Sequence, residues 1–131
     1  MAHVLIADDD EGIRESLRML LEDDGHRVTE CDTGQDALTI LRQEGERCVV
    51  LLDLVMPDMD ELGLLRAIES DAALARRHAY IVLSAGTESL LSQAQPFVTA
   101  LGGMVVRKPF DIDELTRAVS LAEQRLRSSA G

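Results

Sequence analysis

Short runs of consecutive apolar residues alternate along the chain with stretches whose apolar residues recur at helical spacing. The apolar runs cover residues 4–7, 49–52, 80–83 and 104–106, whereas residues 27–31 alternate polar and apolar side chains. Continuous apolar runs are typical of strands covered on both faces, and an alternating strand is typical of a sheet edge. The sequence therefore predicts five strands, with residues 27–31 at an edge.

Amphipathic stretches between these strands predict helices, and the residues at their ends support this. Asp24-Gly25 is a common helix stop and is expected to end the first helix. Thr33 and Asp111 are each followed three residues later by an acidic residue, which is a variant of the capping box. Helices are therefore expected to begin directly after these two residues. A further amphipathic stripe covers residues 62–68.

The stretch from residue 88 to residue 101 has helical spacing but contains Pro96. Because proline removes a backbone donor and clashes with the preceding turn, a broken or short helix is expected there. Five strands alternating with five helices predict an α/β fold with a parallel sheet and right-handed crossovers. A chain of 131 residues suits one domain, which we assign to residues 1–126, with residues 127–131 as a frayed tail or the start of a linker.

The net charge of −11 argues against partners that carry many phosphates, such as nucleic acid or an anionic membrane surface. No apolar stretch approaches the roughly 20 residues that span a bilayer, and the acidic N-terminal segment does not resemble a signal peptide. A soluble, cytoplasmic protein is therefore expected. Cys31 and Cys48 lack the spacing of a zinc motif, which favours their role as small core residues.

Polar residues follow four of the predicted strands at the point where each strand ends. These residues are Asp8, Asp9 and Asp10 after the first strand, Asp53 after the third, Ser84 after the fourth and Lys108 after the fifth. Ligands of open parallel sheets bind beyond the carboxyl ends of the strands, so these side chains are expected to share one site. Capping of a helix explains Asp10 well, but it does not explain Asp53, which precedes Leu54 and Val55 rather than a helix.

Several carboxylates in one site require a cation. Two carboxylates about 4 Å apart repel each other by about 4 kcal/mol at an effective dielectric constant of about 20. Oxygen ligands favour Mg²⁺, which keeps several of its waters and so leaves room for a phosphate oxygen. Lys108 would add a second positive charge and Ser84 a hydroxyl donor. The site is therefore suited to a phosphoryl group that is attached to Asp53 or arrives there.

With these residues in place, the sequence resembles the response-regulator receiver family over about residues 2–126. The resemblance rests on four segments in order: residues 4–10, residues 50–57, the Ser84-Ala85 pair and Lys108-Pro109-Phe110. It implies a doubly wound, flavodoxin-like three-layer sandwich whose parallel sheet has the strand order 2-1-3-4-5. That order would place the first strand between the strands of the two cysteines, so no disulfide is expected.

The resemblance also implies a role for each site residue. Asp53 would be the phosphoacceptor, and Mg²⁺, with Mn²⁺ as a substitute, would be held by Asp8, Asp9, Asp53 and the backbone carbonyl of Val55. Ser84 would move toward the phosphoryl group, and Lys108, joined to Pro109 by a cis peptide bond, would pair with it. The chain would be a signalling switch rather than an enzyme, although it would assist its own phosphorylation and dephosphorylation.

The partners that the resemblance implies are a sensor histidine kinase or histidine phosphotransfer protein, and a downstream target protein. The target would bind the face formed by the helix before residue 101, the strand at residues 104–106 and the last helix. Two residues depart from the family pattern near this output. Val105 replaces the usual aromatic residue, and Glu61 stands where glycine is usual, which would strain a backbone of positive φ.

Three alternative functions make different demands on the sequence. A pseudo-receiver, which is a docking module that keeps the fold without phosphorylation, remains open because of Val105 and Glu61. An aspartate-nucleophile phosphatase of the haloacid dehalogenase type needs a second aspartate two residues after the nucleophile, where this chain has Val55. A phosphate-binding P-loop is excluded because the chain has no GxxxxGK sequence.

Overall fold

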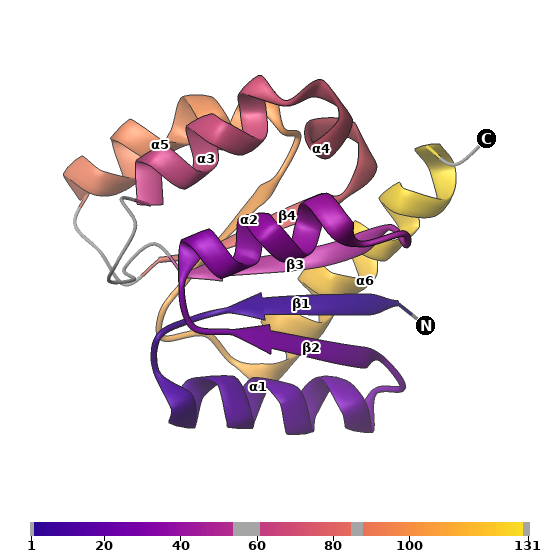
Figure 1. Cartoon of the computed structure of the whole chain (residues 1–131). Helices are drawn as coiled ribbons and strands as arrows, with labels where there is room; N and C mark the ends of the chain where they lie inside the picture. The colour runs from indigo at the N-terminus through magenta and orange to yellow at the C-terminus, as the bar shows by residue number, and fades with distance from the viewer. Residues whose placement is uncertain (1, 54–60, 85–87, 130–131) are drawn as a thin grey trace.

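The computed structural model describes residues 2–53, 61–84 and 88–129, and they form a three-layer α/β sandwich (Figure 1). Its strands are β1 (His3–Ala7), β2 (Arg27–Cys31), β3 (Cys48–Asp53), β4 (Ala79–Ser84) and β5 (Met104–Arg107). All neighbouring pairs are parallel, and the order across the sheet is β2-β1-β3-β4-β5. The predicted parallel sheet, its order and the edge position of residues 27–31 are therefore confirmed.

Helices cover both faces of this sheet. They are α1 (Glu11–Asp23), α2 (Gly34–Gln43), α3 (Glu61–Ser70), α4 (Ala72–Arg77), α5 (Glu88–Ala100) and α6 (Ile112–Ser129). Successive strand residues point to opposite faces, so each strand contributes to two separate cores. Leu5 and Val50 belong to the core beneath α2, α3 and α5, whereas Ile6 and Leu51 belong to the core beneath α1 and α6. Cys31 and Cys48 are buried free thiols, as expected.

The ends of several helices follow the signals in the sequence. The Thr33 hydroxyl accepts a hydrogen bond from the backbone N–H of Asp36 at 3.1 Å, and α2 begins at the next residue. Asp111 Oδ1 accepts from the N–H of Glu114 at 2.7 Å in the same way at the start of α6. Gly25, with a φ of 91°, follows the end of α1 in a conformation that glycine adopts at little cost.

The expectation of a broken or short helix around Pro96 is wrong, because α5 continues for 13 residues with Pro96 inside it. An internal proline costs a helix about 3 kcal/mol. The compensating feature is the apolar stripe of α5, whose buried members are Leu91, Ala94 and Val98. Burial of one large aliphatic side chain contributes about 1.5–3 kcal/mol, so packing on the sheet outweighs the loss of one backbone hydrogen bond.

Two further helical segments differ from the prediction. The structure has an additional short helix, α4, so six helices are described instead of the five predicted. Asp71 begins α4, since its Oδ1 accepts from the N–H groups of Ala73 and Leu74 at 3.1 and 3.3 Å. A helix of six residues is too short to show a clear apolar period. Residues 127–129, expected in a frayed tail, are the last residues of α6.

Within the described residues, no helix has the length and hydropathy of a membrane span.

His78 couples the stability of this fold to pH. The residue is buried, and its Nδ1 accepts a hydrogen bond from the backbone N–H of Cys48 at 3.0 Å. Burial, together with the nearby Arg77, lowers the pKa of His78 from 6.5 to about 4. Protonation of Nδ1 would also remove this hydrogen bond.

We therefore expect the free energy of unfolding to fall as the pH is lowered from about 6.5 to about 4. In this range the unfolded chain binds a proton at His78 that the folded chain does not, and the full effect is about 3 kcal/mol at most. Urea unfolding across this range should show the decline in the wild type and a shallower one in His78→Gln. Equal slopes for the two proteins would contradict the assignment.

Candidate acidic site at the carboxyl edge of the sheet

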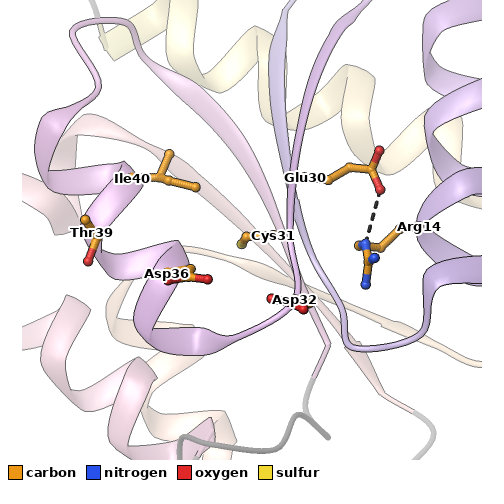
Figure 2. A pocket seen from close by; sticks show the side chains of 7 residues that line it. All are labelled: Arg14, Glu30, Cys31, Asp32, Asp36, Thr39 and Ile40. Carbon is orange, nitrogen blue, oxygen red and sulfur yellow. Dashed lines mark hydrogen bonds and ion pairs between the residues drawn. The ribbon is translucent and has the colours of Figure 1, made fainter.

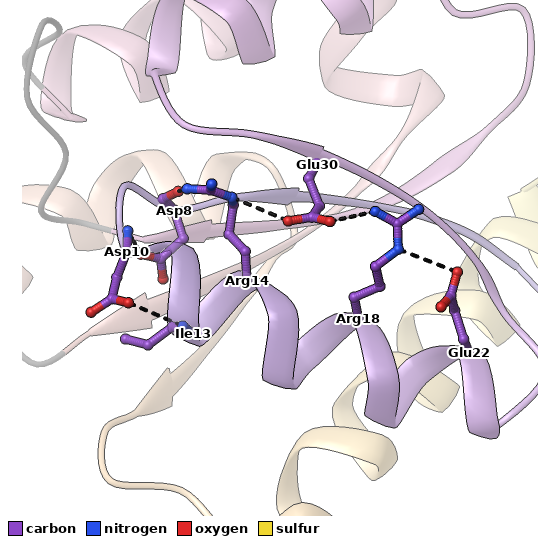
Figure 3. Close-up of polar contacts among 7 residues, drawn as sticks. All are labelled: Asp8, Asp10, Ile13, Arg14, Arg18, Glu22 and Glu30. Carbon is purple, nitrogen blue, oxygen red and sulfur yellow. Dashed lines mark hydrogen bonds and ion pairs between the residues drawn. The ribbon is translucent and has the colours of Figure 1, made fainter.

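Asp8 is the most deeply enclosed residue of the candidate site. It directly follows β1, its side chain is fully buried, and its Oδ1 accepts from the backbone N–H of Asp10 at 2.9 Å. Its backbone carbonyl accepts from Arg14 Nη1 at 2.8 Å, and Arg14 Nε donates to Glu30 Oε1 at 3.1 Å. Figure 3 shows that these contacts connect the end of β1 to α1 and to the edge strand β2. Asp8 is therefore held in position by the backbone of Asp10 and by Arg14, which Glu30 holds in turn.

The carboxylates of Asp8, Asp9 and Asp53 meet at this edge of the sheet. One oxygen from each lies within 4.8 Å of the others. Asp53 is the last residue of β3 and is buried, whereas Asp9 is exposed. The convergence follows from the parallel register of β1 and β3, in which Ala7 is the partner of Leu52. The residues that follow this pair along β1 and β3 are Asp8 and Asp53, so their carboxylates become neighbours.

Lys108 brings a positive charge to this cluster. Its Nζ lies 3.5 Å from Asp53 Oδ1 and 3.6 Å from Asp8 Oδ2, and its side chain is 18% exposed. The peptide bond between Lys108 and Pro109 is cis, as the family resemblance implies. Lys108 is also the only lysine in the 131 residues.

Ser84 lies at the same edge of the sheet. It is the buried last residue of β4, and its backbone carbonyl accepts from the backbone N–H of Lys108 at 2.8 Å. Asp53 and Leu83 are the last register partners of β3 and β4, and Ser84 is the residue of β4 that follows them.

The predicted metal ligand Val55 lies outside the described residues. Glu61 is the first residue of α3, and its side chain is likewise outside them.

The donors in this cluster fit a hard divalent cation. Asp8 Oδ2 is buried and has no hydrogen-bond donor among the residues that the structure describes, and Lys108 Nζ lies 3.6 Å from it. A buried carboxylate oxygen that lacks a hydrogen-bond donor is costly unless cations accompany it. Three carboxylates and no nitrogen or sulfur ligand form the set that Mg²⁺ prefers. The side chains present therefore fit the magnesium ion that the sequence predicts.

A separate polar pocket of about 460 Å³ lies beside β2 (Figure 2). Its lining residues are Arg14, Glu30, Cys31, Asp32, Asp36, Thr39 and Ile40. It shares none of the site's carboxylates, but Arg14 contacts both regions, because its guanidinium group also binds the Asp8 carbonyl. The sequence prediction missed this residue. The only signal for it is the spacing of Arg14 and Arg18 on one face of α1, opposite Glu30.

The fold and site together define a doubly wound α/β domain with a cluster of carboxylates and one lysine at the carboxyl edge of its sheet. Comparison with known families identifies it more closely. The response regulator receiver domain matches residues 4–120, so the chain belongs to that family. Receiver domains are the signalling switches of two-component systems.

Individual relatives agree with this assignment. The chain is 34% identical over 125 residues to the KDP operon transcriptional regulatory protein KdpE of Escherichia coli, covering 95% of this chain and 52% of KdpE. It is 34% identical over 89 residues to protein PilH of Pseudomonas aeruginosa, covering 68% of this chain and 73% of PilH. The chain therefore spans about half the length of the transcriptional regulator and most of the shorter protein.

Solved structures show the same fold. A CheY-like receiver domain protein from Methanospirillum hungatei JF-1 superposes with a TM-score of 0.73 at 28% identity, covering 96% of this chain and 97% of that one. The receiver domain of a Luxo repressor protein from Vibrio parahaemolyticus gives a TM-score of 0.83 at 21% identity, covering 98% and 95%. The second similarity concerns the fold alone.

Proposed function

We propose that this chain accepts a phosphoryl group on Asp53 from the phosphohistidine of a sensor histidine kinase or a histidine phosphotransfer protein. The observation that carries the proposal is the position of Lys108 Nζ, within 3.6 Å of two buried carboxylates at the ends of different strands. The proposal includes the receiver domain boundary at residue 126 and the cytoplasmic location of such relays.

In the proposed reaction, a carboxylate oxygen of Asp53 attacks phosphorus while the bond from phosphorus to the donor's imidazole nitrogen breaks. The imidazole leaves with the electron pair and takes up a proton. Lys108 would pair with the oxygens of the transferring group, where negative charge is concentrated, and the Ser84 hydroxyl would donate to one of them. Asp8, Asp9, Asp53 and the Val55 carbonyl would hold Mg²⁺, or Mn²⁺ in its place, which neutralises charge on the phosphoryl oxygens.

The output in this proposal is a protein–protein contact on the surface of α5, β5 and α6. A pocket of about 310 Å³ lies on this surface between β5 and α6. Leu121 lines it and is 50% exposed, and Val105 lines it from the edge strand while packing partly against the core. Motion of Ser84 toward a phosphoryl group would act on β5 through the Ser84–Lys108 backbone hydrogen bond. This would shift the population between two packings of the surface.

Incubation with acetyl phosphate is the direct test of the proposal. With Mg²⁺, intact mass spectrometry should show a gain of one phosphoryl group, and a chelator should prevent it. Mn²⁺ should replace Mg²⁺. If the folded chain gains no mass at saturating acetyl phosphate and Mg²⁺, it is a docking module that keeps the fold without phosphorylation, and the proposed function is wrong.

A further inference from the structure

A second cluster of metal-ligating side chains lies at the amino edge of the sheet, opposite the acidic site. It consists of His3 at the start of β1, Cys48 at the start of β3 and Glu44 at the end of α2. His3 and Cys48 are direct partners in the register of β1 and β3, and both belong to the face that α2 covers. Figure 1 shows the end of α2 reaching the same edge as the start of β1.

The two separations that start from His3 are close to those around a tetrahedral ion. His3 Nδ1 lies 3.5 Å from Cys48 Sγ and 3.6 Å from Glu44 Oε2, and all three atoms lie within 4.8 Å of one another. With metal–sulfur bonds of about 2.3 Å and metal–nitrogen and metal–oxygen bonds of about 2.1 Å, tetrahedral geometry separates nitrogen from sulfur by about 3.6 Å and nitrogen from oxygen by about 3.4 Å. Little movement is needed to bind such an ion.

Thr29 prepares the imidazole for this role. His3 Nε2 lies 2.7 Å from Thr29 Oγ1, on the neighbouring strand β2. When Nε2–H donates to this hydroxyl, the lone pair of Nδ1 points toward Cys48 and Glu44. Metal-binding histidines commonly donate their second N–H to an acceptor of this kind, which fixes the tautomer and the ring orientation.

The surroundings of Cys48 keep its thiol protonated when no metal ion is bound. Cys48 is 1% exposed, and burial, reinforced by the charge of Glu44, raises the pKa of its thiol to about 11, although Arg27 and Arg77 oppose this. Such a thiol is a poor nucleophile at neutral pH, but a soft metal ion displaces its proton. Burial lowers the pKa of His3, with Arg27 acting in the same direction and Glu44 opposing it. A pocket of about 190 Å³ beside the cluster is lined by His3 and Arg27.

We infer that His3, Cys48 and Glu44 form a site for a divalent transition-metal ion of the zinc class, with a fourth position left for water. One nitrogen, one sulfur and one oxygen ligand suit Zn²⁺ or Co²⁺, whereas Mg²⁺ prefers oxygen ligands alone. The site is thus chemically distinct from the acidic site at the opposite edge of the sheet. Binding would join β1, β3 and the end of α2 through a single ion.

Titration with Co²⁺ tests this inference, because cobalt bound to a thiolate has a charge-transfer absorption that oxygen ligands cannot produce. The full chain, reduced and freed of metal with a chelator, is titrated in excess Mg²⁺, which occupies the acidic site. We expect the thiolate band to saturate at one Co²⁺ per chain and to disappear when Zn²⁺ is added. Since one thiol proton is displaced, the affinity should rise about tenfold from about pH 7 to about pH 8.

Matched variants assign the band to these residues. Cys48→Ala should abolish it, whereas Cys31→Ala, which removes the other buried thiol, should retain it. Glu44→Gln changes a partly exposed side chain and should weaken Co²⁺ binding at least tenfold in a chain whose circular dichroism is unchanged. Thr29→Val should weaken it about 10–100-fold through the orientation of His3.

The inference is overturned if the wild type shows no thiolate band, or if Glu44→Gln and Cys48→Ala bind Co²⁺ as the wild type does. In that case the three side chains form only a hydrogen-bonded part of the core. Asp53→Ala should keep the cobalt band, so failure of the proposed phosphoryl transfer and failure of this site are distinguishable.

Discussion

The Asp53→Ala variant is expected to gain no phosphoryl group from acetyl phosphate under conditions in which the wild type is fully labelled. Asp53 supplies the oxygen that would form the new bond to phosphorus, and alanine has no atom that replaces it. The neighbouring Asp8 is fully buried and is held by the N–H of Asp10, so it is not a ready substitute acceptor. Intact mass spectrometry with Mg²⁺ present is the measurement.

Asp10, in the segment between β1 and α1, offers a matched control. Asp10 is an exposed aspartate whose Oδ1 accepts from the N–H of Ile13 at the start of α1. Asp10→Ser keeps a side-chain cap at this position and should be labelled as the wild type is. If Asp53→Ala gains a phosphoryl group at the wild-type rate, the acceptor assignment is wrong, and peptide mapping would show which residue carries the group.

Replacement of Lys108 by alanine is expected to slow phosphoryl uptake by about 10²–10³-fold, the usual effect of removing one preorganised charge from a developing anion. Lys108 Nζ is 3.5 Å from Asp53 Oδ1, so it lies where the oxygens of the incoming group would be. Lys108→Arg should recover only part of the rate, because a planar guanidinium does not present its charge as a compact ammonium does. Initial rates of mass gain at fixed Mg²⁺ give the comparison.

The same variant has a second expected effect, on stability. Without the ammonium group, the buried carboxylates of Asp8 and Asp53 lose the cation that lies 3.6 and 3.5 Å away. The free energy of unfolding of Lys108→Ala should therefore fall by about 1–3 kcal/mol in the presence of a chelator, and Mg²⁺ should recover more of it than in the wild type. A Lys108→Ala protein that is labelled at the wild-type rate would contradict the proposed role of the lysine.

Buried strands were the most predictable part of this fold. Strands β1, β3 and β4 are covered on both faces, so their residues must be continuously apolar, and their sequences show this directly. Pro96 misled the prediction because local backbone energetics disfavour a helix there, whereas burial of the α5 stripe in the core decides the outcome. Helix α4 escaped notice because six residues are too few for a periodic pattern.

The main residues of the acidic site were predictable because parallel strands end at a common edge. Asp8, Asp53 and Lys108 are far apart in the sequence, yet each follows an apolar strand, and the topology brings them together. Arg14 was not predictable in this way, since its role depends on how α1 packs beside β2. The role of Val55 remains a prediction, because it lies outside the described residues.

The pairing of β1 with β3 has a mechanical consequence. His3 lies opposite Cys48 at one end of the pair, and Asp8 and Asp53 directly follow the last partners, Ala7 and Leu52, at the other end. The offset from His3 to Asp8 is the same as that from Cys48 to Asp53. Any sliding of one strand along the other would therefore separate both pairs of side chains by the same distance, and whatever holds one end in alignment also resists shear at the other.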